Sequence, residues 1–423
     1  MTDNTINTYP VFTEDMKKDY TILIPTMLPM HFNMMASIMR AFGYNAVVLN
    51  NAGSAVKECG LKYVHNDTCY PALLVIGQLI DAISSGSYDP NKVAVLISQT
   101  GGGCRASNYI ALLRKALQKA GYGQIPVLSF NVSGLETQPG FRLSLPMLHR
   151  LIYAVLYGDL LMLLHNQCRP YELNAGESQA LADHWTKKLT DEMAAHRIRY
   201  AVVKRNYRAI LRDFAKIPMR TGSKVKVGIV GEIFVKFSPL GNNHLEDFLF
   251  QENAEVVMPG LLDFCLYATY NNIMDTKLYG IHRLRAIGAK LVFDFLVGKQ
   301  NDLISIIKAH GVFRGPTPFV HTISLTQGYI GIGAKMGEGW LLTAEMLELI
   351  DQGVNNIVCA QPFGCLPNHI VGKGMMKPIK ERHPGVNIVA VDYDPGATKI
   401  NQENRIKLML ANANAGSSAP ISA

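Results

Sequence analysis

Three cysteines of this chain stand on glycine or proline turns, where a thiol can serve as a ligand. Cys104 follows three consecutive glycines, which come after an apolar run and Gln99. Cys69 and Cys365 each stand two residues before a proline. Glycines leave backbone N–H groups open to a ligand, and a helix that begins after such a turn directs its positive end at the thiol. These settings favour the thiolate, the form that binds metal or attacks carbon.

The residues around Cys104 add further groups to its turn. Gly102 and Gly103 bring backbone amides close to the thiol, and Arg105 and Asn108 can contact a bound group. A glycine turn of this kind can also bind a phosphate, with the cysteine taking no part. Both interpretations are open at this point.

Cys359 has a different setting, because it lies inside a strand predicted over residues 356–360. Its sulfur could reach the same centre as Cys365 across the turn between them. It could equally pack in the core as an ordinary buried thiol. The other cysteines lack the strand-then-turn setting and are interpreted as structural: Cys59, Cys168 and Cys265.

Several kinds of centre use converging thiolates. Zinc sites with four cysteines normally contain paired Cys-x-x-Cys knuckles, and this sequence has none. Widely separated cysteines can hold an iron–sulfur cluster, and three protein ligands would leave one iron open. A cysteine nucleophile needs a base. His321 and His369 are available, but nothing in the sequence places either beside a cysteine.

Other glycine-containing pieces carry weaker signals. The segment 331–337 resembles a dinucleotide fingerprint, but its last spacing is wrong and no clean strand precedes it. Gly372 and Lys373 lack the first glycine and the following Ser or Thr of a phosphate-binding P-loop. The sequence therefore shows no motif for ATP hydrolysis.

Apolar runs rich in Val, Ile and Leu alternate with helix-favouring segments along most of the chain. In the first third, strands are predicted at residues 20–25, 46–49, 93–98 and 125–131. A second alternation begins at residue 224, with strands predicted at 225–230, 254–258, 356–360 and 387–391. This pattern is typical of the α/β class, with doubly wound, mainly parallel sheets covered on both faces.

The domain organisation follows from this alternation. We expect a polar arm at 1–19, a first α/β domain at 20–145, a helical connector at 146–222, a second α/β domain at 223–410 and a disordered tail at 411–423. Ligands of open α/β sheets bind at the carboxyl ends of the strands. Cys104 and Cys365 are both predicted at such ends. If the two sheets face each other, these cysteines meet in the cleft between the domains.

Composition excludes several classes of function. A hydrophobic content of 48% with 17% charged residues indicates a well-buried soluble protein. The net charge of +8 is spread along the chain without a long basic run, which argues against nucleic-acid binding. No membrane span and no signal peptide are expected, so the predicted location is cytoplasmic. Seven cysteines, an odd number, argue against a disulfide framework.

Four segments together carry a resemblance to a known family. They are 66–71 (Asn-Asp-Thr-Cys-Tyr-Pro), 99–109 (Gln-Thr-Gly-Gly-Gly-Cys-Arg-Ala-Ser-Asn-Tyr), 228–232 (Gly-Ile-Val-Gly-Glu) and 361–369 (Gln-Pro-Phe-Gly-Cys-Leu-Pro-Asn-His). The chain resembles the cluster-bearing component of the 2-hydroxyacyl-CoA dehydratase and benzoyl-CoA reductase superfamily. The nearest branch is related to acyl-CoA dehydratase activase fusions and to the double-cubane cluster proteins.

The resemblance implies two flavodoxin-like domains with an iron–sulfur cluster between them, either [4Fe-4S] or a double-cubane cluster. Cys69, Cys104 and Cys365 fall on the ligand motifs of the family, and Cys359 is the fourth candidate. A fourth ligand would close the open iron and favour an electron relay over dehydration. A double-cubane cluster would need further thiolates. The implied partners are an ATP-hydrolysing activator (activase) with its own cluster, an acyl-CoA substrate, and a second subunit in a homodimer or heterodimer.

The leading hypothesis is therefore an iron–sulfur protein that accepts low-potential electrons from the activator. It would use them for reduction, or for radical dehydration of an acyl-CoA-like or other small substrate, as in anaerobic metabolism. The alternative is a non-redox binding module that closes two α/β domains over a phosphorylated small molecule. A cysteine-nucleophile transferase is a third hypothesis.

Overall fold

The computed structural model describes residues 9–65, 67–99, 103–130, 138–194 and 198–417. The N-terminal part contains a sheet of four parallel strands, β1 (Thr21–Ile24), β2 (Asn45–Val48), β3 (Val93–Ser98) and β4 (Val127–Phe130). Their order in the sheet is β2-β1-β3-β4. The strands are short, apolar and mostly buried, as expected where helices cover both faces of a parallel sheet.

The C-terminal part contains a second sheet of four parallel strands. These are β5 (Lys226–Gly231), β6 (Glu255–Val257), β7 (Asn356–Pro362) and β8 (Asn387–Tyr393), in the order β6-β5-β7-β8. Numbered within each part, both sheets have the order 2-1-3-4, which is the flavodoxin-like order. The chain is thus an α/β protein with two parallel sheets flanked by helices, and the predicted fold class is confirmed.

In each sheet the first and third strands are neighbours, and the strand order reverses between them. This place is the topological switch point of the sheet. In the first sheet this point lies between β1 and β3, and in the second between β5 and β7. The turn that carries Cys104 follows β3, and the turn that carries Cys365 follows β7. Both turns therefore start at equivalent places in the two sheets.

Helices surround the first sheet. They are α1 (Met16–Asp19), α2 (Pro29–Ala41), α3 (Ser54–Tyr63), α4 (Tyr70–Ser84), the short 3-10 helix η1 (Arg105–Asn108) and α5 (Tyr109–Lys119). The helix α4 begins immediately after Cys69 and has Pro71 in its first turn, where proline needs no hydrogen-bond partner. Thirteen of its residues are buried, so it is a core helix that holds Cys69 in a fixed position.

Three helices connect the two sheets: α6 (Leu145–Cys168), α7 (Glu177–Ala194) and α8 (Tyr200–Phe214). The second part adds α9 (Ile233–Phe237), α10 (Pro239–Asn242), α11 (Leu245–Gln251), α12 (Leu261–Tyr279), α13 (Arg283–His310), α14 (Phe319–Leu325), α15 (Trp340–Asp351), the π-helix η2 (Asn368–Lys373), α16 (Gly374–Arg382) and α17 (Lys399–Ser417). Helix α6 is long and apolar enough to cross a membrane, but most of that apolar stretch is buried inside the protein, as in a core helix.

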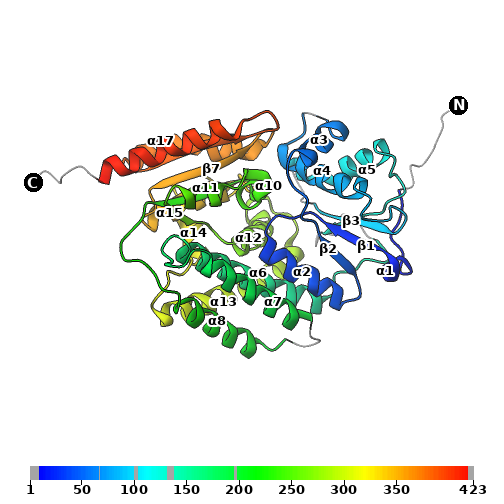
Figure 1. The fold of residues 1–423 in the computed structure, drawn as a ribbon, viewed down its shortest axis with the longest axis horizontal. Coiled ribbons are helices and arrows are strands. Elements are labelled where there is room, and N and C mark those ends of the chain that lie inside the picture. Colours follow the sequence, from blue (N-terminus) through cyan, green and yellow to red (C-terminus); the bar gives the residue numbers. More distant parts are fainter. Residues whose placement is uncertain (1–8, 66, 100–102, 131–137, 195–197, 418–423) are drawn as a thin grey trace, which may run out of the picture.

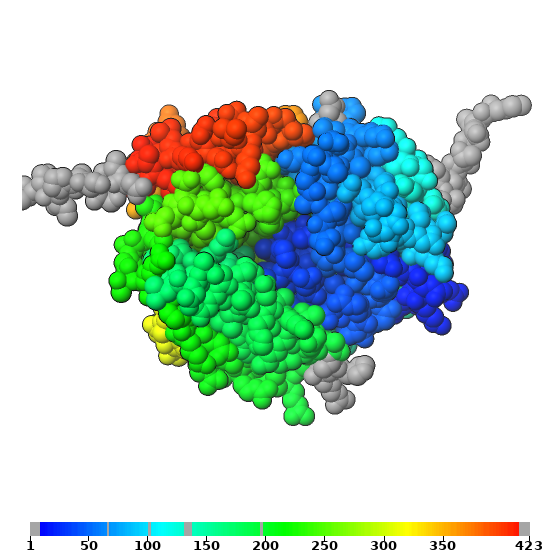
Figure 2. Space-filling view, in the orientation of Figure 1, coloured from blue at the N-terminus to red at the C-terminus, as the bar shows by residue number. Residues whose placement is uncertain are grey.

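The two sheets and the connecting helices share a continuous hydrophobic core. Figure 1 shows the N-terminal part in blue beside the C-terminal part in orange and red, and in the space-filling view of Figure 2 their surfaces meet without a gap. Asp159 of α6 lies at the centre of this packing. Its carboxylate accepts a 2.8 Å hydrogen bond from His31 Nε2 on α2 and 2.8 and 2.9 Å bonds from the backbone N–H groups of Leu261 and Leu262. Beside it, Gly158 lets α2 approach closely, because a Cβ there would lie 2.3 Å from the His31 ring.

The ends of the chain differ from expectation. Of the loose arm expected at 1–19, residues 1–8 lie outside the described residues, whereas Phe12 is fully buried and α1 packs near β2. Of the disordered tail expected at 411–423, residues 411–417 continue helix α17, and residues 418–423 lie outside the described part of the chain. Alanine and asparagine repeats in this segment tolerate a helix, and the composition alone does not reveal that.

Candidate cysteine centre

The turn that holds Cys365 lies directly against the start of helix α4. The backbone N–H of Tyr70 donates a 2.9 Å hydrogen bond to the carbonyl oxygen of Phe363. Gly364 has a φ of +73°, and a Cβ at this position would lie 3.0 Å from Cys69 Cα. Only glycine combines this backbone conformation with this close approach. The backbones that carry Cys69 and Cys365 are therefore in contact.

Cys104 faces the same junction through a loop of the second part. A Cβ at Gly337, whose φ is +60°, would lie 2.9 Å from Pro367 Cγ and 3.7 Å from Cys104 Sγ. The backbone N–H of Gly103 is 3.0 Å from the sulfur of Met336. The segment 331–337, which lacks the dinucleotide-binding spacing, thus serves as a loop that covers the Cys104 turn. The structure brings Cys69, Cys104 and Cys365 together where the two parts meet.

Equivalent glutamines brace the two cysteine turns. Gln99 follows β3, and its Nε2 donates a 2.7 Å hydrogen bond to the carbonyl oxygen of Ser107. Gln361 is the last residue but one of β7, and its Nε2 lies 2.9 Å from His369 Nδ1. Each bond spans eight residues and encloses a cysteine. Such a hydrogen bond restrains the conformation of the turn. The backbone that carries each thiol is therefore restrained in the same way in the two parts.

The remaining predicted residues of the Cys104 turn lie around it in different ways. Gly103, Arg105 and Asn108 are exposed, and Asn108 precedes helix α5 without capping it through its side chain. Arg105 lies near enough to Cys69 for its charge to favour the Cys69 thiolate. Gly102 lies outside the described residues, as do Thr100, Gly101 and Asn66 of the quoted motifs.

Two buried carboxylic acids, Glu232 and Glu338, complete the centre. Glu232 is the N-cap of α9, where its Oε2 accepts a 2.9 Å bond from Val235 N, and Glu338 Oε1 accepts a 3.0 Å bond from Ile233 N. Both act on Cys104 and Cys365 electrostatically, and Glu232 also acts on Cys69. Sequence reasoning gave neither acid a role, although Glu232 stands in a quoted motif. Glu338 follows a loop with no strand signal, so nothing in the sequence pointed to it.

The environment of the thiols differs from the expected one. Burial raises the pKa of Cys104 to about 11, and the nearby carboxyl of Glu338 adds to this effect. The pKa of Cys365 rises further for the same two reasons, and burial also raises the pKa of Cys69, against the hydrogen bond with Tyr109 Oη at 3.3 Å. The expectation that the helix ends favour thiolates was wrong for the protein without a bound group. The loss of solvation outweighs the helix dipole.

Cys359 lies apart from these three residues. It is fully buried, its sulfur is 3.6 Å from Asn368 Oδ1, and it packs in the small hydrophobic cluster of β7 with α15 and α16. Burial raises its pKa to about 12, and the charged groups that act on it are Glu345, Asp392 and Lys236. None of the other three cysteines is among them.

The remaining cysteines have neighbours elsewhere in the fold. Cys59 lies on α3 near Asp81, Cys168 ends α6 near Glu172, and Cys265 lies on α12 near Asp263. All seven cysteines are free thiols. A double-cubane cluster would need more thiols than the three that converge, so the described residues give that form of the cofactor no support.

The arrangement can be compared with what different bound groups require. Among the described residues, no group of three or more His, Cys, Asp or Glu side chains stands close enough to hold a single metal ion. An iron–sulfur cluster is larger than one ion, so its cysteine ligands stand further apart. Three thiols on three turns fit a cluster in this respect, and glycines at 103, 337 and 364 let these turns and the loop over them approach one another closely.

A histidine base for a nucleophilic cysteine is not evident. His321 Nε2 pairs with Asp351 at 2.9 Å, and His369 Nδ1 is held by Gln361. Neither ring has a hydrogen bond to a thiol among the described residues.

Comparison with known proteins adds no assignment. The chain matches no model of a known protein family and no curated protein. The site must therefore be interpreted from its own residues.

Proposed function

We propose that the protein binds an iron–sulfur cluster of the [4Fe-4S] type through Cys69, Cys104 and Cys365. It accepts low-potential electrons from an ATP-hydrolysing activator and uses them, in the cytoplasm, for reduction or radical dehydration of a small substrate such as an acyl-CoA. The observation that supports this most is the meeting of three thiols from equivalent turns of two sheets at one junction. Cys359 stays a fourth candidate whose buried position would require the β7 turn to rearrange.

A bound cluster supplies one-electron chemistry at low potential. The protein supplies the rest. Because the pKa values of the three thiols are raised, each thiol loses its proton only when a cationic centre binds to its sulfur. Binding of a cluster would therefore release protons. With three protein ligands, the fourth position of the cluster is open to a substrate oxygen.

One of the two buried acids can supply a proton at this place. Burial raises the pKa of Glu232 to about 8, with Glu338 adding to the effect, so Glu232 keeps a proton near neutral pH. Burial also raises the pKa of Glu338. Glu232 Oε2 accepts from Val235 N, so its proton is held on Oε1. Glu232 could protonate a departing hydroxyl or a reduced substrate.

An apolar surface beside the centre is suited to a redox partner. Four exposed apolar side chains lie on the Cys365 turn and on the loop 331–337 that covers the Cys104 turn: Met336, Phe363, Leu366 and Ile370. Exposed apolar side chains gathered in one place mark interaction sites. A docked activator would bring its own cluster close to the thiols here.

A second exposed apolar surface, on helix α13, supports a dimer. Leu284, Ile287 and Leu291 are 86%, 62% and 69% exposed and repeat at the spacing of a coiled-coil seam. A Cβ at Gly288 would meet nothing within 4 Å, so the helix surface is open there. The occupant that fits is a second copy of the chain, because an apolar stripe is complementary to itself.

The proposal is tested by purifying the full chain without oxygen and measuring iron and acid-labile sulfide. A brown protein with about four irons per chain that gives an electron paramagnetic resonance signal after reduction by a low-potential reductant is expected. A folded protein that stays colourless after reconstitution with iron and sulfide would contradict the proposal. That result would favour the binding module that closes over a phosphorylated molecule.

A further inference from the structure

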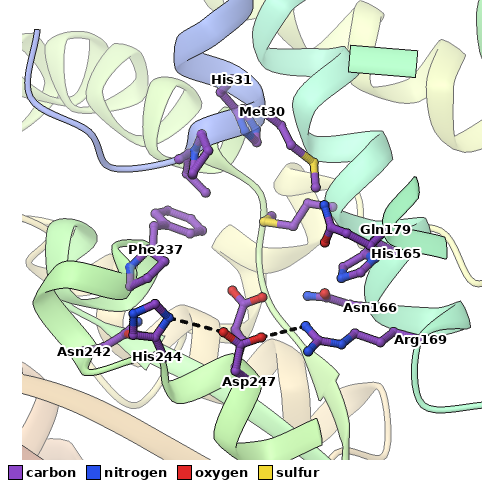
Figure 3. A pocket seen from close by; sticks show the side chains of 15 residues that line it. Met30, His31, His165, Asn166, Arg169, Gln179, Phe237, Asn242, His244 and Asp247 are labelled. Carbon is purple, nitrogen blue, oxygen red and sulfur yellow. Dashed lines mark hydrogen bonds and ion pairs between the residues drawn. The ribbon is translucent and has the colours of Figure 1, made fainter. Parts of the chain in front are cut away.

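A cavity of about 200 Å³ lies between the two parts of the chain, at a place separate from the cysteines (Figure 3). Its walls come from the start of α2, the end of α6 and the helices α9 to α11. Phe237, at the end of α9, lines the cavity, whereas Glu232 of the cysteine centre caps the beginning of the same helix. A cavity of this volume suits a small ligand.

Three buried polar atoms at this cavity have no hydrogen-bond partner among the described residues. They are His31 Nδ1, His165 Nδ1 and Asn166 Oδ1, on side chains that are at most 5% exposed. His31 Nε2 is held by Asp159, which leaves Nδ1 as the ring atom without a partner. Asn166 Oδ1 is an acceptor. Unsatisfied buried acceptors are costly and indicate a missing donor.

The two acidic residues at the cavity differ in their ion-pair partners. Asp247 is held by Arg169 at 2.8 Å and by His244 at 3.2 Å, as the dashed lines of Figure 3 show. Glu246 also lines the cavity, and the part of the chain that the structure describes offers it no ion pair. Asn166 donates a hydrogen bond to it and the Arg169 guanidinium favours its charged form, but burial and the nearby Asp247 raise the pKa of Glu246 to about 7. An ammonium group beside Glu246 would therefore hold its carboxylate in the charged form.

Apolar side chains complete the walls. Met30, Met162 and Phe237 line the cavity together with the polar atoms. Thioether and aromatic groups adapt to a short hydrocarbon chain and attract a cation. Asn166 Oδ1, the Glu246 carboxyl and the apolar walls together suit a ligand with a positively charged donor group and a small apolar body.

We propose that this cavity binds a small primary amine. Its ammonium group donates to Glu246 and Asn166 Oδ1, and its hydrocarbon part packs on Met30, Met162 and Phe237. The proposal does not depend on a bound cluster, because none of these residues belongs to the cysteine centre.

The test is calorimetric titration of the full chain with butylamine, and with butanol and butyrate as neutral and anionic probes of similar size. Butylamine should bind in the millimolar range or tighter, and butyrate should not bind. Glu246→Gln should weaken butylamine binding about tenfold or more, because it removes a charged hydrogen bond. Glu58→Gln, the same change at an exposed site on α3, should leave the affinity unchanged.

Thermal unfolding checks that Glu246→Gln stays folded. If it fails to fold, Asn166→Asp provides the second test, because an added carboxylate should strengthen amine binding. Three results would overturn the proposal: no heat with butylamine at millimolar concentrations, equal affinity in wild type and Glu246→Gln, or tighter binding of butyrate than of butylamine.

Discussion

The backbone N–H of Tyr70 donates a 2.9 Å hydrogen bond to the carbonyl oxygen of Phe363. This bond joins the helix that begins after Cys69 to the turn that holds Cys365, across the junction between the two parts of the chain. Cys69 and Cys365 are therefore held together by a backbone contact rather than by side chains alone. Changes in the backbone at this junction should disturb the centre even when every cysteine is kept.

Gly364→Ala should lower the stability of the protein and its iron content. The left-handed backbone at this position costs about 1–2 kcal/mol for an alanine, and the added Cβ would also press on Cys69 Cα at 3.0 Å. Chemical unfolding and iron analysis measure the two effects.

Gly353→Ala is the matched control. Its φ of +76° is nearly that of Gly364, but an added Cβ meets nothing within 4 Å. It should lose stability through the backbone alone and keep the iron content of the wild type. Equal iron contents in both variants would show that the Cys69–Gly364 contact does not position the centre.

Asp159→Asn should destabilise the protein by about 3 kcal/mol. The carboxylate caps α12 and holds His31, and an amide replaces one of its acceptor atoms with a donor. Urea unfolding measures the loss. Asp294→Asn, which breaks only the exposed pair with Lys290, should change stability by less than about 0.5 kcal/mol. Similar losses of stability in the two variants would contradict the role of Asp159 at the junction.

Stability should fall as the pH decreases from about 6.5 to about 4 because of His165. Burial lowers its pKa to about 4 in the folded chain, with Arg169 adding to the effect, from an ordinary value of 6.5. The unfolded chain therefore takes up the proton first, and the stability present above pH 6.5 is lost by up to about 3 kcal/mol.

His165→Phe removes this proton uptake. Unfolding of the variant, measured across the same pH range, should show a shallower slope than the wild type, whatever its stability at neutral pH. Parallel slopes would mean that His165 is not kept neutral in the folded chain.

Leu284→Lys combined with Leu291→Lys should convert a dimer to a monomer, because lysines would face each other across the α13 seam. Light scattering after size-exclusion chromatography measures the mass. Leu408→Lys, at a leucine of α17 with 66% exposure, is the control and should not change it. A wild type that is monomeric at high concentration would contradict the α13 pairing.

Much of the fold could be predicted because its signals are local. The bounds of β3 match the predicted ones, since an apolar run rich in Val and Ile defines them. Helix α13 is less evident in the sequence. Its earlier turns carry Gly288, Gly298 and apolar residues on the outer face, so they do not show the usual one-sided pattern.

The candidate centre could be predicted only in part. Cysteines on turns after strand ends are visible in the sequence, because parallel topology brings strand ends together. Which face of a strand a residue occupies depends on register, and Cys359 lies inside β7 facing α15 and α16. Glu338 enters the centre through a loop that folds back over Cys104, a long-range contact that no short motif encodes.

Iron content of single cysteine variants tests the central claim most directly. Cys69→Ser, Cys104→Ser and Cys365→Ser should each lose most of the iron and sulfide of the anaerobically purified wild type. Cys168→Ser, a buried cysteine at the end of α6, should keep both, and Cys359→Ser decides whether a fourth thiol takes part. Full iron content in the three variants, or the same loss in Cys168→Ser, would contradict a cluster held where Cys69, Cys104 and Cys365 meet.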